Sequence, residues 1–212
     1  MYLARTPALV KPLLKEFTWS MPSTGKDLYL TFDDGPTPDV TPWVLDTLAE
    51  RGALATFFVL GRNAAAEPML MERIRNEGHA LGNHTWDHPN GWRTPFFTYL
   101  RSVVRCAAEV DTALFRPPYG RISRQQSRAV RNRYELVMWD VLSADFDTGL
   151  SGDQCTLNVT RNAVPGSIIV FHDSVKAEPR LRIALPQALA HFADLGYRFK
   201  KLEAQEIRAA RT

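Results

Sequence analysis

Several features that direct a protein to a particular chemistry or location are missing from this 212-residue sequence. It has 2 cysteines, Cys106 and Cys155, and no CxxC or Cys/His zinc spacing surrounds them, which argues against a disulfide framework. Lys11, Lys15 and Glu16 interrupt the apolar stretches near the N-terminus, so neither a signal-peptide core nor a membrane span is predicted. We therefore expect a cytoplasmic protein with two free thiols and no membrane partner.

Signals for nucleotide or nucleic-acid binding are also missing. Neither a GxGxxG fingerprint nor a GxxxxGK phosphate loop occurs. The formal net charge is +3, but 26 Lys and Arg are interspersed with 23 Asp and Glu, so no basic stripe for a nucleic acid is predicted. A single hydrophobic core normally serves up to about 250 residues, and we predict one domain over residues 1–212.

Short apolar runs alternate with longer amphipathic stretches along the chain, which indicates repeated βα units and an α/β fold. The seven predicted strands are Leu28–Phe32, Ala55–Leu60, Ala80–Asn83, Leu114–Arg116, Glu135–Val141, Ser167–His172 and Tyr197–Lys201. The predicted helices are Pro42–Arg51, Pro68–Asn76, Phe96–Ala113, Arg124–Arg133, Gly152–Asn162 and Pro186–Leu195. Polar residues follow one strand after another, and in a barrel all those strand ends meet at one mouth. The pattern favours a barrel over an open doubly wound sheet.

Two pairs of residues in this pattern indicate a metal site. Asp33 and Asp34 end a predicted strand on a Gly-Pro turn, and side chains that alternate along a strand give adjacent carboxylates different directions and roles. A polar turn is the alternative interpretation of this block. His84 and His88 have the spacing that, on a helical turn, puts both imidazoles within reach of one ion. With one Asp added, this set leaves a coordination position open for water, as in catalytic zinc sites.

Three further residues complete the predicted mouth of the barrel. Arg116 ends a strand before a rigid diproline, and a buried arginine needs an anion, which the Asp pair supplies. His172 ends the sixth predicted strand, and a carboxylate beside it would keep it protonated. We favour Asp145 over Asp173 as that carboxylate, because residues adjacent in sequence seldom face each other.

Together these blocks resemble the motifs of the polysaccharide deacetylase family of carbohydrate esterases, over about residues 27–202. The matching segments are Thr31 to Pro36, His84 to His88, Arg116 to Gly120, Trp139 to Asp147 and Ile168 to Asp173. The resemblance implies a distorted (β/α) barrel with about seven parallel strands. It further implies a metal-dependent hydrolase that removes N-acetyl groups from an acetylated amino-sugar oligomer or polymer and releases acetate. Zinc is the favoured ion, with cobalt, nickel and manganese as alternatives.

The resemblance also implies a role for each site residue. Asp33 matches the general base, and Arg116 the residue that positions it. The Tyr119 backbone N–H matches the oxyanion donor, and His172 matches the general acid, tuned by Asp145. The implied metal ligands are Asp34, His84 and His88.

Other features leave the substrate open. Phe146 and Val170 stand where many family members have Trp and Leu beside the acetate pocket, and most bacterial members act outside the cytoplasm. A cyclic ureide or imide is the first alternative substrate class, and it needs no long sugar-binding groove. Trp86, Trp92 and Phe96 near the metal would supply stacking faces for a sugar ring, although aromatic residues more often belong to a core. A catalytically inactive sugar-binding barrel is the second alternative, although no base, ligand or acid is missing. The oligomeric state and the substrate length are not predictable from the sequence.

Overall fold

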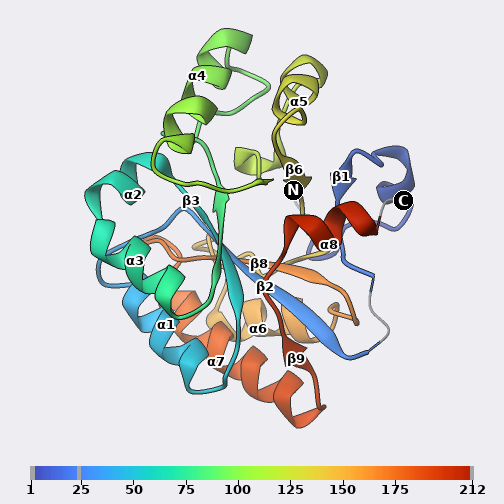
Figure 1. The fold of residues 1–212 in the computed structure, drawn as a ribbon. Coiled ribbons are helices and arrows are strands. Elements are labelled where there is room, and N and C mark those ends of the chain that lie inside the picture. Colours follow the sequence, from blue (N-terminus) through green and yellow to red (C-terminus); the bar gives the residue numbers. More distant parts are fainter. Residues whose placement is uncertain (1–2, 23–24, 211–212) are drawn as a thin grey trace.

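A curled sheet of parallel strands forms the centre of the structure, a computed structural model that describes residues 3–22 and 25–210 (Figure 1). The strands are β1 (Phe17–Thr18), β2 (Asp27–Asp33), β3 (Ala55–Val59), β4 (Ala80–Asn83), β5 (Leu114–Phe115), β6 (Glu135–Val137), β7 (Val141–Leu142), β8 (Ile168–His172) and β9 (Arg198–Phe199). The α-helices are α1 (Thr41–Ala49), α2 (Gly61–Ala66), α3 (Pro68–Asn76), α4 (Phe96–Ala107), α5 (Arg124–Val130), α6 (Gly152–Thr160), α7 (Glu178–Asp194) and α8 (Ala204–Ala209). The strands lie in the order β1-β6-β5-β4-β3-β2-β8-β7, with β9 beside β2.

The connection between β6 and β7 shows how strongly the sheet curls. β6 pairs with β1 and β5 near one end of the strand order, whereas β7 pairs with β8 at the other end. Only Met138, Trp139 and Asp140 separate the two strands, and that connection reaches about 14 Å at most. The two ends of the sheet therefore come together, which confirms the predicted α/β barrel of parallel strands. The single predicted strand Glu135–Val141 is wrong, because the chain leaves β5 at this point and joins β8.

Hydrophobic packing explains why the carboxyl ends of the strands remain available for a site. All seven residues of β2 are buried, as expected for a central strand covered on both faces. Inside the barrel, Tyr29 and Ile168, near the amino ends of β2 and β8, share one cluster with Leu202 and Ile207 from the C-terminal segment. The helix α8 thus covers the barrel interior on the side of the amino ends.

The outer helices cover the other face of the sheet. A second cluster joins apolar residues of α1, α3, α6 and α7 to β2, β3 and β8. Cys106 and Cys155 are both buried and unpaired, as predicted. The predicted helix Pro186–Leu195 is too short, because α7 already begins at Glu178 and places Pro186 in its interior. Buried residues on both sides of the proline, including Leu181 and Leu189, anchor that longer helix against the core.

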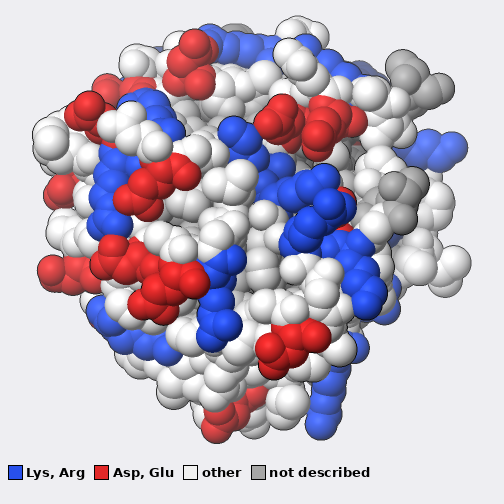
Figure 2. Space-filling model, turned by 60° about the horizontal axis from the view of Figure 1, so that its bottom comes forward, with Lys and Arg blue, Asp and Glu red and all other residues white. Residues whose placement is uncertain are grey.

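Charged groups are mixed on the surface. Figure 2 shows acidic and basic side chains side by side over much of the face it presents. Several are paired across elements, such as Arg73 with Asp46 and Arg198 with Asp27. Within residues 3–22 and 25–210, every helix is too short or too polar to cross a bilayer.

A close contact between β3 and β4 generates a prediction about stability. A Cβ atom at Gly82 would overlap the ring of Phe58, which is fully buried and lies 4.1 Å from the Arg116 guanidinium carbon. Gly82→Ala should therefore lower the free energy of unfolding by about 1–3 kcal/mol through overpacking. Denaturant titration measures this loss. Gly25→Ala, whose nearest atom would be 3.4 Å away, is the control, and equal losses in the two variants would contradict the packing explanation.

Candidate active site

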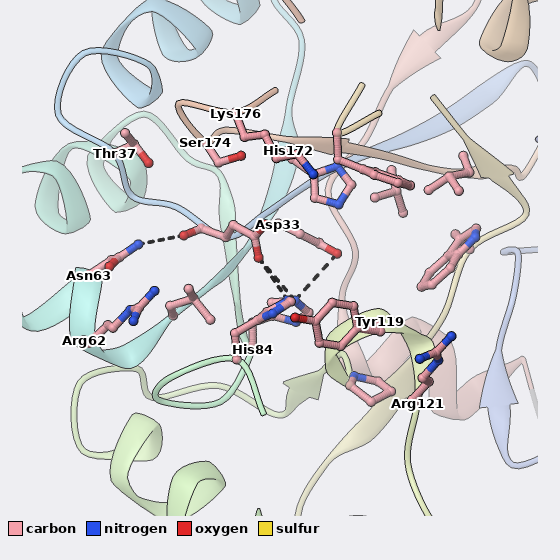
Figure 3. A pocket seen from close by; sticks show the side chains of 18 residues that line it. Asp33, Thr37, Arg62, Asn63, His84, Tyr119, Arg121, His172, Ser174 and Lys176 are labelled. Atoms are coloured by element: carbon pink, nitrogen blue, oxygen red, sulfur yellow. Dashed lines mark hydrogen bonds and ion pairs between the residues drawn. The ribbon is translucent and has the colours of Figure 1, made fainter. Parts of the chain in front are cut away.

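A cavity of about 660 Å³ opens at the carboxyl ends of the central strands (Figure 3). Its lining includes Asp33 and Asp34 from the end of β2, His84 and His88 after β4, and His172 at the end of β8. The parallel register places Asp33 directly beside His172 on the neighbouring strand. The structure thus brings together polar residues that lie at or just after the carboxyl ends of three separate strands.

Arg116 and Asp33 form a buried ion pair behind this cavity. Nη1 of Arg116 lies 2.7 Å from Oδ1 of Asp33, and the arginine side chain is fully buried. Its other N–H groups donate to the hydroxyl of Thr31 and to the carbonyls of Val137 and Met138, so little of its hydrogen-bonding capacity is unused. Burial lowers the pKa of Arg116, and the charge of Asp33 opposes that change. The pair fixes one oxygen of Asp33 and leaves the other, Oδ2, 4.0 Å from Nε2 of His84.

Asp34, His84 and His88 together form a possible metal site. Oδ1 of Asp34 lies 3.7 Å from Nε2 of His84 and 3.2 Å from Nε2 of His88. Two donors that each lie about 2.1 Å from a tetrahedral ion are about 3.4 Å apart, so the spacing fits a shared ion. Oδ1 of Asp34 is buried and has no hydrogen-bond partner in the described part of the chain, as expected of an oxygen reserved for a cation.

Protonation also favours a metal at these three residues. Nδ1 of His84 lies 2.8 Å from the carbonyl oxygen of Arg116. A carbonyl only accepts, so Nδ1 carries the proton and Nε2 presents its lone pair to the cavity. Burial and the neighbouring His84 lower the pKa of His88 to about 4, which keeps that imidazole neutral. Burial alone would raise the pKa of Asp34, but nearby positive charges, first that of His172, lower it overall.

The two histidines are brought together by a loop and not by the helical turn that we predicted. Residues 84–88 belong to no helix or strand, and both Thr85 (φ 69°) and His88 (φ 62°) adopt left-handed conformations. Side chains stabilise this path, because Asn83 accepts from the Thr85 N–H and the Thr85 hydroxyl accepts from the His88 N–H. Local hydrogen bonds of this kind compete with helix formation, which is why the spacing alone was misleading.

The turn after β2 separates the directions of the two aspartates. Asp34 has a positive φ of 80°, and its carbonyl accepts a hydrogen bond of 2.7 Å from the side chain of Asn63. Gly35 follows, and its N–H donates to the carboxylate of Asp173 at 3.1 Å. A Cβ atom at Gly35 would overlap that carboxylate, so only glycine fits here.

His172 is held by Asp145, as we favoured, and not by Asp173. Nδ1 of His172 lies 2.7 Å from Oδ1 of Asp145, and the His172 backbone N–H donates to Oδ2 at 2.8 Å. Burial by itself lowers the pKa of His172, but the charge and hydrogen bond of Asp145 raise it to about 9. Asp173 is instead engaged by the hydroxyl of Thr41 and the N–H of Gly35. His172 is therefore protonated at neutral pH.

Tyr119 lies beside the possible metal site. It adopts a φ of 60° in the short turn of residues 118–120, and its ring packs edge-on against His88 with 4.4 Å between ring centroids. In the described residues its backbone N–H donates to no other group, so this donor is available to a ligand.

Some residues that shape the site were missed or misplaced from the sequence. Asn63 lies in the first turn of α2, four residues beyond the end of β3, so a search for polar residues within a few positions of each strand end would have found it. Arg180 gave no such signal; it is buried in α7 and donates to the carbonyl of Asp145 at 2.5 Å. The aromatic residues that we expected near the metal, Trp86, Trp92 and Phe96, do not line the cavity. Its aromatic lining consists of Tyr119, Trp139 and Phe146.

The sequence profile of the family described as "Polysaccharide deacetylase" matches residues 20–139, more than half of the chain. The chain belongs to this family. It is 38% identical over 165 residues to a peptidoglycan-N-acetylglucosamine deacetylase of Bacillus cereus, which covers 74% of the chain and 60% of the relative. It is 39% identical over 157 residues to a chitooligosaccharide deacetylase of Azorhizobium caulinodans, which covers 69% of the chain and 73% of the relative.

A solved structure supports the same relationship. The fold is similar to that of the Bc1960 peptidoglycan N-acetylglucosamine deacetylase, with a TM-score of 0.85 and 33% identity over 93% of this chain and 95% of that one. The chain spans less than two thirds of the Bacillus cereus relative described above.

The geometry of Asp34, His84 and His88 predicts that each side chain is needed to bind a metal. His84→Ala and His88→Ala should each reduce bound metal from about one ion per chain to a small fraction, because the two remaining donors would hold the ion weakly. Metal content after dialysis, measured by elemental analysis, tests this. His191→Ala, at an exposed position of α7, is the control and should keep its metal. Unchanged metal in both site variants would place the ligands elsewhere.

The contact between His172 and Asp145 predicts a shift in pH dependence. The pKa of His172 is about 9 because a negative charge stabilises the imidazolium. Asp145→Asn removes that charge, and the pKa should fall by about 1–3 units, which moves the alkaline limb of the kcat/KM profile to lower pH. Nuclear magnetic resonance titration of His172 measures the same shift directly. Asp153→Asn, exposed on α6, should leave it in place. If the alkaline limb of the kcat/KM profile does not move in Asp145→Asn, Asp145 has only a structural role.

Proposed function

We propose that the protein is a metal-dependent hydrolase that removes N-acetyl groups from an acetylated amino sugar or its oligomers. The observation that carries this proposal is one cavity lined by three kinds of group. They are the three possible metal ligands described above, a carboxylate held by a buried arginine (Asp33), and a histidine held protonated by a carboxylate (His172). Family membership, and the activities that the relatives are named for, support it.

A divalent ion would be held by Asp34, His84 and His88. When bound, it would lower the pKa of a water molecule and polarise the acetamide carbonyl. We propose zinc, because two imidazoles and one carboxylate with an open position are the ligands of many catalytic zinc sites. Cobalt, nickel and manganese suit the same donors.

Asp33 is proposed to act as the general base. Arg116 occupies Oδ1, so Oδ2 is the oxygen that faces the site and takes a proton from the attacking water. As the water oxygen bonds to the carbonyl carbon, negative charge develops on the carbonyl oxygen. The free backbone N–H of Tyr119 is proposed to donate a hydrogen bond to that oxygen.

His172 is proposed to act as the general acid. An amine anion is far too basic to leave, so the carbon–nitrogen bond breaks only as the nitrogen gains a proton. His172 holds that proton at neutral pH because Asp145 stabilises its charged form. Acetate and a free amino group on the sugar result.

The wall beside His172 suits the methyl of an acetyl group. Leu142 and Val170 belong to a small apolar cluster against which Trp139 and Phe146 pack, and all four residues line the cavity. Phe146 also packs edge-on against His172, with 5.2 Å between ring centroids. A methyl group placed there would lose contact with water next to the reacting carbonyl.

The relatives are named for activity on peptidoglycan and on chitooligosaccharides, and an acetylated amino sugar is common to both names. We propose that class of substrate for this chain. The cytoplasmic location and the single-domain organisation that we inferred from the sequence remain predictions.

A substrate panel tests the proposed function. Purified protein, stripped with a chelator and then reloaded with zinc, should release acetate from a chitin tetramer and from peptidoglycan fragments only when the metal is present. Acetate is measured by a coupled colorimetric assay, and a cyclic ureide and a cyclic imide serve as the alternative substrates. Hydrolysis of those cyclic amides without acetate release from any sugar, or full activity in stripped protein, would contradict the proposal.

A further inference from the structure

Positive charge is concentrated in one segment of the chain, residues 89–134, which contains α4 and α5. This segment has nine of the 26 Lys and Arg, all of them arginines, but two of the 23 Asp and Glu. The other residues have 17 Lys and Arg against 21 Asp and Glu, so the rest of the chain is net acidic. Apart from Arg116, which is buried against Asp33, all arginines of the segment are exposed. The even mixture of charges in the whole sequence therefore does not hold here.

The outer face of α4 combines arginines with exposed apolar side chains. Four exposed residues recur at the spacing of one helical face: Phe97, Arg101, Val104 and Arg105. Phe97 and Val104 are 78% and 69% exposed, although large apolar side chains normally pack inside a protein. The opposite face of the helix, which includes Tyr99, is buried. Both kinds of exposed group on α4 are thus available to a partner.

The outer face of α5 presents a row of arginines. Arg124, Arg128 and Arg131 follow one another at helical spacing, and all three are exposed. The inner faces of α4 and α5 pack into one apolar cluster with β5 and β6, to which Tyr99 and Val130 belong. Because both helices cover the same part of the sheet, their outer faces point to the same side of the molecule. The two helices lie next to each other at the top of Figure 1.

Few carboxylates compensate the charge on these two faces. Within residues 3–22 and 25–210, the arginines of the outer faces of α4 and α5 form no ion pair, whereas Arg73 and Arg198 each bind a carboxylate. The acids of the segment, Glu109 and Asp111, lie beyond the end of α4. Uncompensated arginines interleaved with exposed apolar groups are typical of helices that bind the surface of an anionic membrane.

We propose that α4 and α5 dock the protein on an anionic lipid bilayer. The docking surface consists of seven exposed residues: Phe97, Arg101, Val104, Arg105, Arg124, Arg128 and Arg131. The guanidinium groups bind lipid phosphates with paired hydrogen bonds. The apolar side chains enter the boundary between headgroups and acyl chains. The sequence predicts no membrane partner because it lacks a membrane span, but contact with a membrane surface needs no span.

A nucleic acid is the other common partner of an arginine-rich surface. Single strands bind along positively charged grooves in which aromatic rings stack on the bases. The exposed groups here lie on the outward faces of two helices, and Val104 has no ring to stack. Trp92, just before α4, is 67% exposed, but its ring already lies 5.2 Å from the guanidinium of Arg121. These features favour a lipid surface.

Sedimentation with lipid vesicles tests the proposal. The wild type should bind vesicles of equal parts phosphatidylcholine and phosphatidylglycerol at least about tenfold more tightly than vesicles of phosphatidylcholine alone. Raising the salt concentration from about 0.1 M to about 0.5 M should weaken that binding, because ions screen the charges. Equal affinities for the two kinds of vesicle, or no binding to either, would overturn the proposal. No substrate is present, so the result does not depend on the proposed deacetylase function.

A triple variant locates the docking surface. Arg101→Gln, Arg124→Gln and Arg128→Gln together should weaken binding to the anionic vesicles about tenfold or more, because each arginine adds to the attraction. All three side chains are exposed and lie outside the cavity lining, so the fold should persist, which circular dichroism checks. Wild-type affinity in this folded variant would place the binding elsewhere and overturn the proposal.

The matched control removes the same amount of charge from other parts of the surface. Lys15→Gln, Arg51→Gln and Arg161→Gln replace three exposed cations outside α4 and α5, and this variant should keep the wild-type affinity for anionic vesicles. A loss equal to that of the first triple variant would show that net charge alone drives binding, and would also overturn the proposal.

The apolar part of the surface distinguishes a bilayer from a nucleic acid. Phe97→Ser should weaken binding to the anionic vesicles about fivefold, because a side chain that enters the bilayer is lost. A single-stranded oligothymidine is the second probe, and the wild type should bind it more weakly than the vesicles at the same salt concentration. Tighter binding of the oligothymidine, together with unchanged vesicle binding in Phe97→Ser, would assign the surface to nucleic acid and contradict the proposal.

Discussion

The buried contact between Arg116 and Asp33 is the interaction on which both the barrel and its site depend. The guanidinium binds Thr31 and Asp33 on β2 and the carbonyls of Val137 and Met138, where β6 gives way to the connection that brings the two ends of the sheet together. Removing one partner of such a buried pair typically costs about 3–5 kcal/mol, because the other charge is left unpaired. The Arg116 side chain therefore links β2 to the end of β6 at the open end of the barrel, and it orients the Asp33 carboxylate toward the cavity.

The contact with Arg116 also gives the neighbouring carboxylates of Asp33 and Asp34 different roles. Asp33 is committed to Arg116, whereas the left-handed conformation of Asp34 turns its carboxylate toward His84 and His88. Left-handed non-glycine residues cost energy and persist only where the surroundings enforce them. Here Asp34, Thr85, His88 and Tyr119 all have positive φ at or beside the cavity. The fold thus maintains local strain where the possible ligands and the free N–H group converge.

The helices and strands that were predicted correctly from the sequence are those defined by the local pattern of apolar residues. The strand at Ala80–Asn83 and the helix at Pro68–Asn76 match the structure residue for residue, because apolar periodicity and flanking turn residues define them. The split between β6 and β7 and the loop from His84 to His88 depend on contacts between distant segments or on side-chain hydrogen bonds, which periodicity does not report.

The division of work between the two aspartates is tested most directly by comparing Asp33→Asn with Asp34→Asn. Metal content and acetate release are measured on the same preparations, with folding checked by circular dichroism. Asp33→Asn should keep about one ion per chain and lose about 10²–10⁴-fold in turnover, as for removal of a general base. Asp34→Asn should lose the ion together with activity. Loss of metal in Asp33→Asn, or an intact metal site in Asp34→Asn, would contradict the separation of base and ligand.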